Sequence, residues 1–525
     1  MQFSWRRLPI KSFRKFYEGE NKCKSVVRSL SQRVSTEFRE HNPDMSRITL
    51  DTLNSHAKAA EYAVRGAIVS RSAELAAQLK DDPNSLPFNQ IISCNIGNPQ
   101  ALAQKPISFV RDVVSCVVND RLLESDMIPE DAKARARKYL DCGSSMGAYT
   151  ESKGLIAVRE EVAEFLHRRD GFPANTDSIY LTNGASAGVG LVMQTVMRDP
   201  ASGVQDGIMA PIPQYPIYSA LSTLLNGELV PYYLDEENAW ACSEEAILSA
   251  MEHAEEHGIT LRGLVVINPG NPTGQVLARG DMENIIKICR ERGVAIMADE
   301  VYQENVYREG SEFHSFRKVA FEMDAFSGDN PLQLASFHST SKGFLGECGF
   351  RGGYFELNGF PQEVNDVLYK MASLGLCANT VGQVITGAMV NPPQSGDVSF
   401  DQYMGEKTAI LDSMKRRAAK LSAALNELEG VTCNSADGAM YAFPRIRLGA
   451  EAASEAQKQG MAPDAFYCME LLNHTGVVVV PGSGFGQAPG TMHFRTTILP
   501  PESQLDSVIA SLGDFHAKFL AKYPL

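Results

Sequence analysis

Ser339-Thr340-Ser341-Lys342-Gly343-Phe344 is the stretch around which the rest of the chain can be interpreted. It comes just after an apolar run, Leu332 to Phe337, whose length and composition predict a β-strand. Lys342 therefore follows a strand end, which is where an α/β sheet binds its ligands. Such a lysine can attack an aldehyde if its neighbours lower its pKa. Because most lysines are solvated and Ser-x-x-Lys also occurs by chance, the stretch gains its meaning only from its surroundings.

Those surroundings alternate between predicted strands and helices from about residue 150. The expected strands cover 179–181, 207–210, 264–267, 294–298, 332–337 and 352–355. Helical periodicity occurs between them, for example at Leu155, Val158, Val162 and Leu166. Strands that alternate with helices predict an α/β fold with a mostly parallel sheet covered by helices on both faces. After a turn-rich stretch at 391–397, a long charged helix at about 405–428 and mixed short elements predict a smaller α+β domain.

The overall composition narrows the classes of partner. The chain has 525 residues, of which 44% are hydrophobic and 21% are charged, and its net charge of −14 argues against nucleic acid as a partner. No stretch approaches the roughly 18 apolar residues of a membrane span, so we expect no membrane association. The ten cysteines are scattered without zinc-ligand spacing, so we expect no metal site.

The N-terminus differs from the rest of the chain. Residues 1–36 hold nine Lys or Arg, six Ser and only two acidic residues. This composition is typical of an organelle transit peptide, and we predict one over residues 1–40. We expect the mitochondrial matrix, with plastid or cytoplasm as alternatives; a disordered basic tail would have the same composition.

Polar residues after the predicted strands match the needs of a pyridoxal 5'-phosphate site. The aldehyde needs a lysine, for which Lys342 is the candidate, and the ring nitrogen needs a carboxylate such as Asp299 to keep it protonated. Tyr302 and Asn271 are candidates to donate to the phenolic oxygen, and Tyr215 is a candidate to stack on the ring.

The phosphate and the substrate need further groups. The backbone of Ala185 and Ser186 lies between a predicted strand and helix, and such turns bind anions. Ser339 and Arg351 flank Lys342 and can complete the phosphate site, and Arg495 is a candidate to grip a substrate carboxylate. Each residue alone has an ordinary structural explanation, such as a turn, a helix cap or a core aromatic. Their order along the chain carries the prediction.

Several motifs resemble those of one known family. They are Tyr62-Ala63-Val64-Arg65-Gly66, Asn95-Ile96-Gly97-Asn98-Pro99-Gln100, Gly147-Ala148-Tyr149-Thr150, Asn268-Pro269-Gly270-Asn271-Pro272-Thr273-Gly274, Ser341-Lys342-Gly343, Glu347-Cys348-Gly349 and Arg351-Gly352-Gly353-Tyr354. From about residue 45 onward the chain resembles the class I aminotransferases of pyridoxal-phosphate fold type I, and within them the alanine aminotransferases. Relatives that use glyoxylate share much of this pattern.

The resemblance implies a role for each candidate. Lys342 would form a Schiff base with the cofactor and then shuttle the substrate proton. Arg495 would bind the α-carboxylate, with Gly97 and Asn271 lining the same pocket. Tyr149 resembles a tyrosine that reaches the phosphate in the partner subunit, which implies a homodimer with shared sites.

The implied reaction is a ping-pong transamination of L-alanine and 2-oxoglutarate to pyruvate and L-glutamate. The implied domains are an N-terminal arm with part of the small domain at 41–114, a large cofactor-binding domain at 115–404 and a small C-terminal domain at 405–525. The chain also departs from the wider family. The ring-stacking residue is a tyrosine where aspartate aminotransferases have tryptophan, and no second arginine for a distal carboxylate is evident.

Three alternatives remain open at this point. A glutamate–glyoxylate aminotransferase would share the site and differ in its acceptor; the C-terminal Lys522-Tyr523-Pro524-Leu525, which is not a peroxisomal signal, argues weakly against it. A lyase of the same fold type would convert the cofactor with S-adenosylmethionine and not with alanine. A cofactor-binding regulator would need a basic DNA-binding domain, for which 36 residues are too few.

Overall fold

The computed structural model describes residues 47–62, 66–143, 145–198 and 203–525. The predicted transit peptide at 1–40 lies outside these ranges. The chain divides into two compact units, Met1–Lys58 and Ala59–Leu525, and everything below concerns the second unit. The short helix α3 (Ser55–Ala59) spans the boundary between the units.

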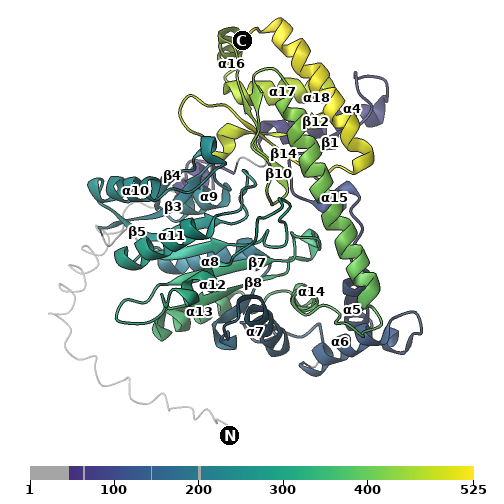
Figure 1. Cartoon of the computed structure of the whole chain (residues 1–525), viewed down its shortest axis with the longest axis vertical. Coiled ribbons are helices and arrows are strands. Elements are labelled where there is room, and N and C mark those ends of the chain that lie inside the picture. Colours follow the sequence, from purple (N-terminus) through teal and green to yellow (C-terminus); the bar gives the residue numbers. More distant parts are fainter. Residues whose placement is uncertain (1–46, 63–65, 144, 199–202) are drawn as a thin grey trace, which may run out of the picture. The chain divides into compact units, whose positions relative to one another are not determined.

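A seven-stranded sheet forms the centre of this unit, and the prediction of a mostly parallel sheet is confirmed (Figure 1). Only β8 is antiparallel to its neighbours. In spatial order the strands are β2 (Ile179–Leu181), β8 (Gly353–Asn358), β7 (Leu334–Ser339), β6 (Ala295–Asp299), β5 (Ile259–Ile267), β3 (Gln205–Ile212) and β4 (Glu228–Tyr233).

Most residues of the central strands are buried because both faces of the sheet are covered. Side chains alternate between the two faces: Leu264 and Val266 pack into one core, whereas Val265 and Ile267 pack into the other. The first core includes α10 (Glu244–Glu256), α11 (Arg279–Arg292) and α12 (Phe316–Glu322). The second includes α8 (Ala185–Val196), α9 (Ile217–Leu224) and α13 (Gln362–Leu374).

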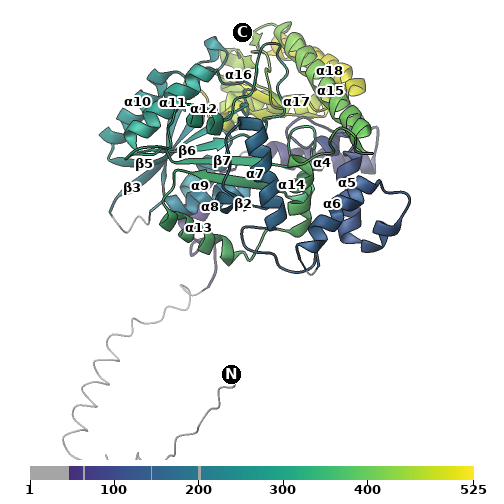
Figure 2. The same ribbon diagram turned by 60° about the horizontal axis from the view of Figure 1, so that its bottom comes forward.

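A third core lies beside β2 and β8. It is built by four helices, of which α7 and α14 lie side by side (Figure 2). These helices are α5 (Ser108–Val118), α6 (Glu130–Asp141), α7 (Ile156–Asp170) and α14 (Thr380–Val390). The aliphatic periodicity predicted around Val158 and Val162 is the buried face of α7.

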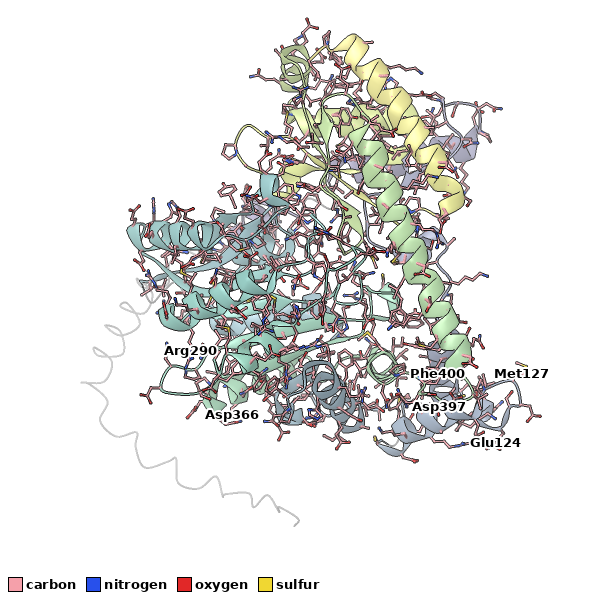
Figure 3. All side chains as sticks on the ribbon, in the orientation of Figure 1. Glu124, Met127, Arg290, Asp366, Asp397 and Phe400 are labelled. Carbon is pink, nitrogen blue, oxygen red and sulfur yellow. The ribbon has the colours of Figure 1, made fainter. Side chains whose placement is uncertain are left out.

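The long charged helix predicted at about 405–428 is α15 (Phe400–Asn426). It begins after a turn in which the Asp397 carboxylate accepts from the backbone N–H of Gln394 at 2.7 Å (Figure 3 labels Asp397 and Phe400). Its first turns pack into the third core through Tyr403, and its later turns pack into a fourth core through residues such as Leu421. One helix thus connects two cores.

The fourth core combines the C-terminal part of the chain with an N-terminal segment. Its helices are α4 (Ala67–Asp81), α16 (Ala450–Lys458), α17 (Pro463–Thr475) and α18 (Glu502–Lys522). Its short sheets are β1 (Ile92–Ser93) with β12 (Val477–Val478), β10 (Tyr441–Ala442) with β14 (Phe494–Thr497) and β13 (Val480–Pro481), and β9 (Val431–Thr432) with β11 (Arg445–Ile446). The domain boundaries at 114 and 404 remain predictions.

The described ranges lack both membrane-spanning helices and metal-binding clusters. Within them, no helix combines the length and the apolar character that a membrane crossing requires. The same ranges hold no group of three or more His, Cys, Asp or Glu side chains arranged to bind a metal ion.

Candidate active site

The carboxyl ends of three neighbouring parallel strands meet at one edge of the sheet. Asp299 ends β6, Ser339 ends β7 and Asn271 follows β5 in the next loop. A cavity of about 420 Å³ opens there. Its lining includes eleven of the twelve predicted site residues, namely Gly97, Ala185, Ser186, Tyr215, Asn271, Asp299, Tyr302, Ser339, Lys342, Arg351 and Arg495.

Lys342 projects into this cavity from the loop after β7. Its Nζ donates to the carbonyl of Gly97 at 3.0 Å. Gly97 has to be glycine at this close approach, because a Cβ there would lie 3.1 Å from Lys342 Nζ and 2.3 Å from the hydroxyl oxygen of Tyr441. The amine therefore contacts backbone on one side and the open cavity on the other.

Asp299 is buried and only half satisfied. Its Oδ2 accepts from the Tyr218 hydroxyl at 2.8 Å, whereas its Oδ1 has no hydrogen-bond partner among the described residues. Burial raises the pKa of Asp299, and the Tyr218 hydrogen bond and the charge of Lys342 oppose that rise. A buried carboxylate oxygen that lacks a partner costs free energy, and a cationic N–H donor in the cavity would remove the cost.

The start of α8 lines the same cavity with backbone N–H groups that can bind an anion. The helix begins with Ala185 and Ser186, whose N–H groups have no acceptor within the helix. Gly184, at φ +81°, allows Arg351 to approach, because a Cβ there would lie 2.3 Å from Arg351 Nη2. Arg351 also donates to Ser341 Oγ at 3.3 Å. Ser341 belongs to the motif around Lys342, but sequence reasoning did not select it as a site residue.

Arg495 is 1% exposed and comes from β14 in the fourth core. Its Nη1 donates to Asn271 Oδ1 at 3.1 Å and its Nη2 donates to the carbonyl of Asn95. Its Nε has no partner among the described residues. The guanidinium carbon lies 4.2 Å from the ring centroid of Tyr441 and 4.6 Å from that of Phe485. A fork held in one plane with free donors suits a carboxylate.

Aromatic residues form much of the remaining wall. The Tyr215 hydroxyl lies 2.6 Å from that of Tyr62, and the Tyr302 hydroxyl donates to that of Tyr441 at 3.1 Å. Burial raises the pKa of Tyr215 and of Tyr302 well above the ordinary value. Sequence reasoning missed Tyr218 and Tyr441. The three-residue spacing from Tyr215 could have indicated Tyr218, but nothing local distinguishes Tyr441 from a core tyrosine.

Tyr149 is the predicted site residue that does not line the cavity. Tyr149 is 79% exposed. Its predicted contact is with a partner subunit, and that role stays a prediction.

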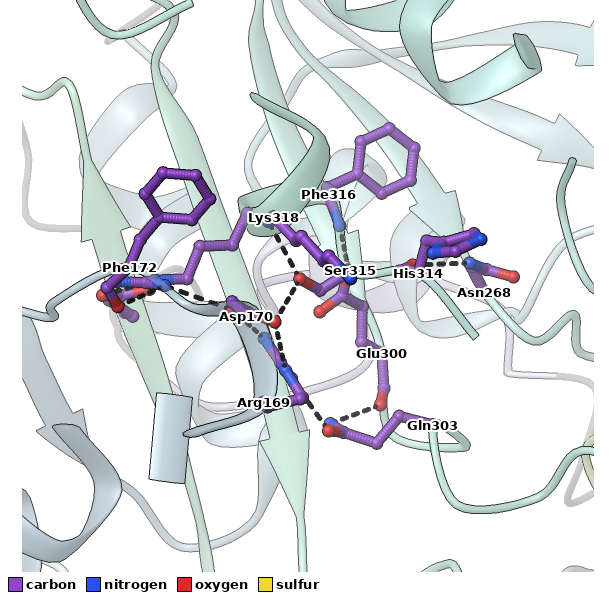
Figure 4. Close-up of polar contacts among 12 residues, drawn as sticks. Arg169, Asp170, Phe172, Asn268, Glu300, Gln303, His314, Ser315, Phe316 and Lys318 are labelled. Atoms are coloured by element: carbon purple, nitrogen blue, oxygen red, sulfur yellow. Dashed lines mark hydrogen bonds and ion pairs between the residues drawn. The ribbon is translucent and has the colours of Figure 1, made fainter. Parts of the chain in front are cut away.

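Glu300, which follows Asp299 in the sequence, belongs to a buried group of charged side chains, part of which is shown in Figure 4. Glu300 is 1% exposed, and its Oε1 accepts from the backbone N–H of Phe316 at 2.7 Å. Arg169 pairs with Asp170 at 2.7 Å and donates to Gln303. Burial is the main reason that the pKa of Glu300 rises to about 7.

The fold and the cavity together define a pyridoxal-phosphate-dependent enzyme of fold type I. The residues fit the cofactor, because the cavity contains a lysine amine, a buried carboxylate oxygen without a partner and an anion site at a helix start. The profile of the family "Aminotransferase class I and II" matches residues 111–512. The chain belongs to this family; it is a transaminase that acts on amino and keto acids and uses pyridoxal 5'-phosphate.

Similar proteins narrow the comparison. The chain is 48% identical over 482 residues to alanine aminotransferase 2, mitochondrial, of Arabidopsis thaliana. The matched region covers 91% of this chain and 88% of that protein. It is 48% identical over 486 residues to a probable mitochondrial alanine aminotransferase of Dictyostelium discoideum, covering 91% and 90%. It is 45% identical over 479 residues to glutamate–glyoxylate aminotransferase 1 of Arabidopsis thaliana, covering 90% and 96%.

Solved structures support the fold. Alanine aminotransferase from Pyrococcus furiosus superposes with a TM-score of 0.69 at 23% identity, over 89% of this chain and all of that one. An aminotransferase from Escherichia coli gives the same TM-score and identity over 90% and 99%. At this level of identity the likeness concerns the fold alone.

Proposed function

We propose that this transaminase transfers the amino group of L-alanine to 2-oxoglutarate, giving pyruvate and L-glutamate. The names of the relatives at 48% identity support the donor. One observation carries the assignment of the site: Lys342, Asp299 and Arg495 open into the same cavity although they come from different elements. This arrangement brings an amine, a carboxylate for a ring nitrogen and a grip for a carboxylate within reach of one small substrate.

In this proposal four groups of residues would hold the cofactor. Ala185, Ser186, Ser339 and Arg351 would bind the phosphate, and Asp299 would accept from the ring nitrogen. Tyr302 and Asn271 would hydrogen-bond the phenolic oxygen, and Tyr215 would stack on the ring. When bound, pyridoxal 5'-phosphate supplies an electron sink for the bond that breaks at the substrate α-carbon.

The chain itself supplies binding and proton transfer. Arg495 fixes the α-carboxylate, which orients the α-hydrogen toward Lys342. Lys342 Nζ then takes the α-proton and later returns a proton. The carbonyl of Gly97, at 3.0 Å, holds the free amine between these steps.

A single spectrum tests the proposal. L-alanine added to the purified holoenzyme should bleach the long-wavelength absorbance of the bound cofactor and release pyruvate in equal amount. S-adenosylmethionine should leave the absorbance unchanged. Bleaching by S-adenosylmethionine and not by alanine would indicate a lyase and refute the assignment.

Glyoxylate is the second candidate acceptor, because a glutamate–glyoxylate aminotransferase is 45% identical to the chain. The cationic side chains that line the cavity, among the described residues, are Lys342, Arg351 and Arg495. Because all three have other proposed partners, no cation among the described lining residues is left for the distal carboxylate of glutamate. Enzyme first converted with alanine should recover its absorbance faster with 2-oxoglutarate than with glyoxylate at equal concentration; the reverse order would favour the second candidate.

We further propose a homodimer in which Tyr149 contributes to the phosphate site of the other subunit. Tyr149 is 79% exposed within one chain, which leaves its side chain accessible to a second subunit. Mixed dimers provide the test. A Lys342→Ala subunit paired with a Tyr149→Ala subunit should regain activity at one site, whereas a tyrosine that served its own subunit would leave both sites impaired.

Finally, we propose import into the mitochondrial matrix. The mitochondrial names of two relatives and the basic, serine-rich residues 1–36 support it. Mass spectrometry of the native protein should find an N-terminus beyond the first residues. A native chain that starts at Met1 would contradict cleavage of a transit peptide.

A further inference from the structure

His493 is a buried histidine two residues before Arg495 in the sequence. It is 2% exposed, and Arg495 is 1% exposed. Its backbone forms a bridge with Arg445, and β14 continues from Phe494. Because alternate residues of an extended strand project from the same face, the side chains of His493 and Arg495 lie on one side of this segment.

Both ring nitrogens of His493 face acceptors. Nδ1 lies 3.0 Å from Oε1 of Gln487, and Nε2 lies 3.1 and 3.2 Å from the two carboxylate oxygens of Glu236. The amide of Gln487 has this orientation because its Nε2 donates to Asp464 Oδ2 at 3.4 Å. A neutral imidazole carries only one N–H, so it would leave one of these acceptors without a donor. The contacts therefore favour an imidazolium that donates to both partners.

The charged groups around the ring also favour the imidazolium. Glu236 faces it directly, and Asp464 is one side chain further away. Arg445, which bridges to His493, lies 3.7 Å from the Glu236 carboxylate and 3.2 Å from that of Glu237. Carboxylates thus outnumber cations among these neighbours. The resulting ion pair joins the stretch after β4 to the segment before β14.

Packed aromatic rings connect His493 to the guanidinium of Arg495. The His493 ring is stacked on that of Phe443, with centroids 4.8 Å apart and planes at 4°. The Phe443 ring meets that of Phe485 edge to face, with centroids 5.9 Å apart. Phe485 in turn lies 4.6 Å from the guanidinium carbon of Arg495. Because protein interiors are close-packed, a displacement of the first ring would be passed on to the last.

We propose that His493 is a positioning residue for the Arg495 guanidinium. Its imidazolium, held by Glu236, keeps the rings of Phe443 and Phe485 in place. Those rings fix the plane of the guanidinium, which two parallel N–H···O bonds to a carboxylate require. This inference rests on the carboxylate-binding role proposed above for Arg495. Loss of the charge on His493 would weaken carboxylate binding without removing any group that contacts the substrate.

Binding of propionate to the holoenzyme tests this proposal. Propionate has the carboxylate and methyl group of alanine but no amino group, so calorimetry gives a Kd for carboxylate binding without chemistry. At pH 6, His493→Gln should raise this Kd by roughly threefold to tenfold, the size expected when one member of a coupled pair is lost. Glu236→Gln should have the same effect, and the double variant should bind no more weakly than either single variant. Turnover at saturating substrate should be nearly unchanged, because the reacting groups are untouched.

The pH dependence separates the effect of the charge from a loss of packing. High pH removes the proton from an imidazolium, so the difference between wild type and His493→Gln should be largest at pH 6 and should shrink at pH 9. An equal difference at both pH values would mean that the ring acts without its charge, and it would overturn the inference. His257→Gln makes the same change on an exposed histidine and should bind propionate as the wild type does.

Arg495→Lys separates this inference from the role on which it rests. If Arg495→Lys leaves the Kd unchanged, another residue binds the carboxylate, and both that role and this inference fail. If it weakens binding but neither His493→Gln nor Glu236→Gln does so, only the inference fails. Thermal unfolding should verify that each variant is folded. Glu236→Gln, in a side chain that is 19% exposed, decides the matter if His493→Gln does not fold.

Discussion

Glu300→Gln should remove a pH-dependent loss of stability from this protein. Glu300, labelled in Figure 4, follows Asp299 in the sequence and is 1% exposed. Burial raises its pKa from 4.5 to about 7, since the favourable charge of Arg169 and the Phe316 N–H do not offset desolvation and the repulsion of Asp170 and Glu356. His338, which also faces it, has its pKa lowered to about 3 by burial and stays neutral.

The sign follows from linkage. Between pH 4.5 and 7 the folded protein keeps a proton on Glu300 that the unfolded chain has released. The stabilisation is complete below pH 4.5 and is lost as the pH rises through 7. A shift from 4.5 to about 7 corresponds to about 3 kcal/mol. Glutamine resembles the protonated acid at every pH and lacks this dependence.

Thermal unfolding of the holoenzyme at pH 5, 6, 7 and 8 measures the effect. A chain of 525 residues has an unfolding entropy of about 1 kcal/mol/K, so the gap between variant and wild type should widen by about 3 °C from pH 5 to pH 8 in favour of the variant. Glu309→Gln makes the same chemical change on a side chain that is 94% exposed and should show no such widening. A Glu300→Gln gap that stays constant with pH would mean that Arg169 compensates the buried charge fully.

Three further substitutions test the site. Lys342→Ala should abolish both turnover and the long-wavelength absorbance of the bound cofactor; if either persists, another amine holds the aldehyde. Arg495→Lys should raise the KM for amino and keto acids by roughly tenfold or more, because a point charge cannot replace a planar fork, and an unchanged KM would assign the carboxylate to another residue. Gly184→Ala should weaken cofactor binding by roughly tenfold or more in a fluorescence titration, since its Cβ would lie 2.3 Å from Arg351 Nη2 at a φ of +81°. Gly190→Ala, within α8, is the control: the atom nearest to its Cβ would be 3.8 Å away, and cofactor affinity should be retained.

The strand-end residues could be predicted because their positions follow from local rules. A buried strand is recognisable from its apolar run, and polar residues just after parallel strands share one edge of the sheet. Asn271, Asp299 and Lys342 satisfy that rule without any knowledge of the strand order. The start of α8 at Ala185 was predictable for a similar reason, since a glycine between strand and helix marks an anion-binding turn.

Residues that approach the site from a separate core could not be derived in this way. Arg495 was selected through its motif and the resemblance, whereas Tyr441 and Tyr218 resemble ordinary core tyrosines in the sequence. What makes each functional is a contact made only in the folded chain: Tyr218 satisfies one oxygen of Asp299, and Tyr441 covers Arg495.

The reason for a glycine at position 97 also could not be derived from the local sequence. Its motif suggested a pocket residue, but the physical reason for glycine is the volume that Tyr441 and Lys342 occupy beside it. The identity of this glycine is thus fixed by two residues far away in the sequence, one in the loop after β7 and one in the fourth core. Since Tyr441 and Arg495 lie on adjacent strands of one small sheet, a shift of that sheet would move the Arg495 guanidinium and the hydroxyl beside Lys342 together. The pairing of these strands places both groups at the cavity, and no local pattern in the sequence encodes that pairing.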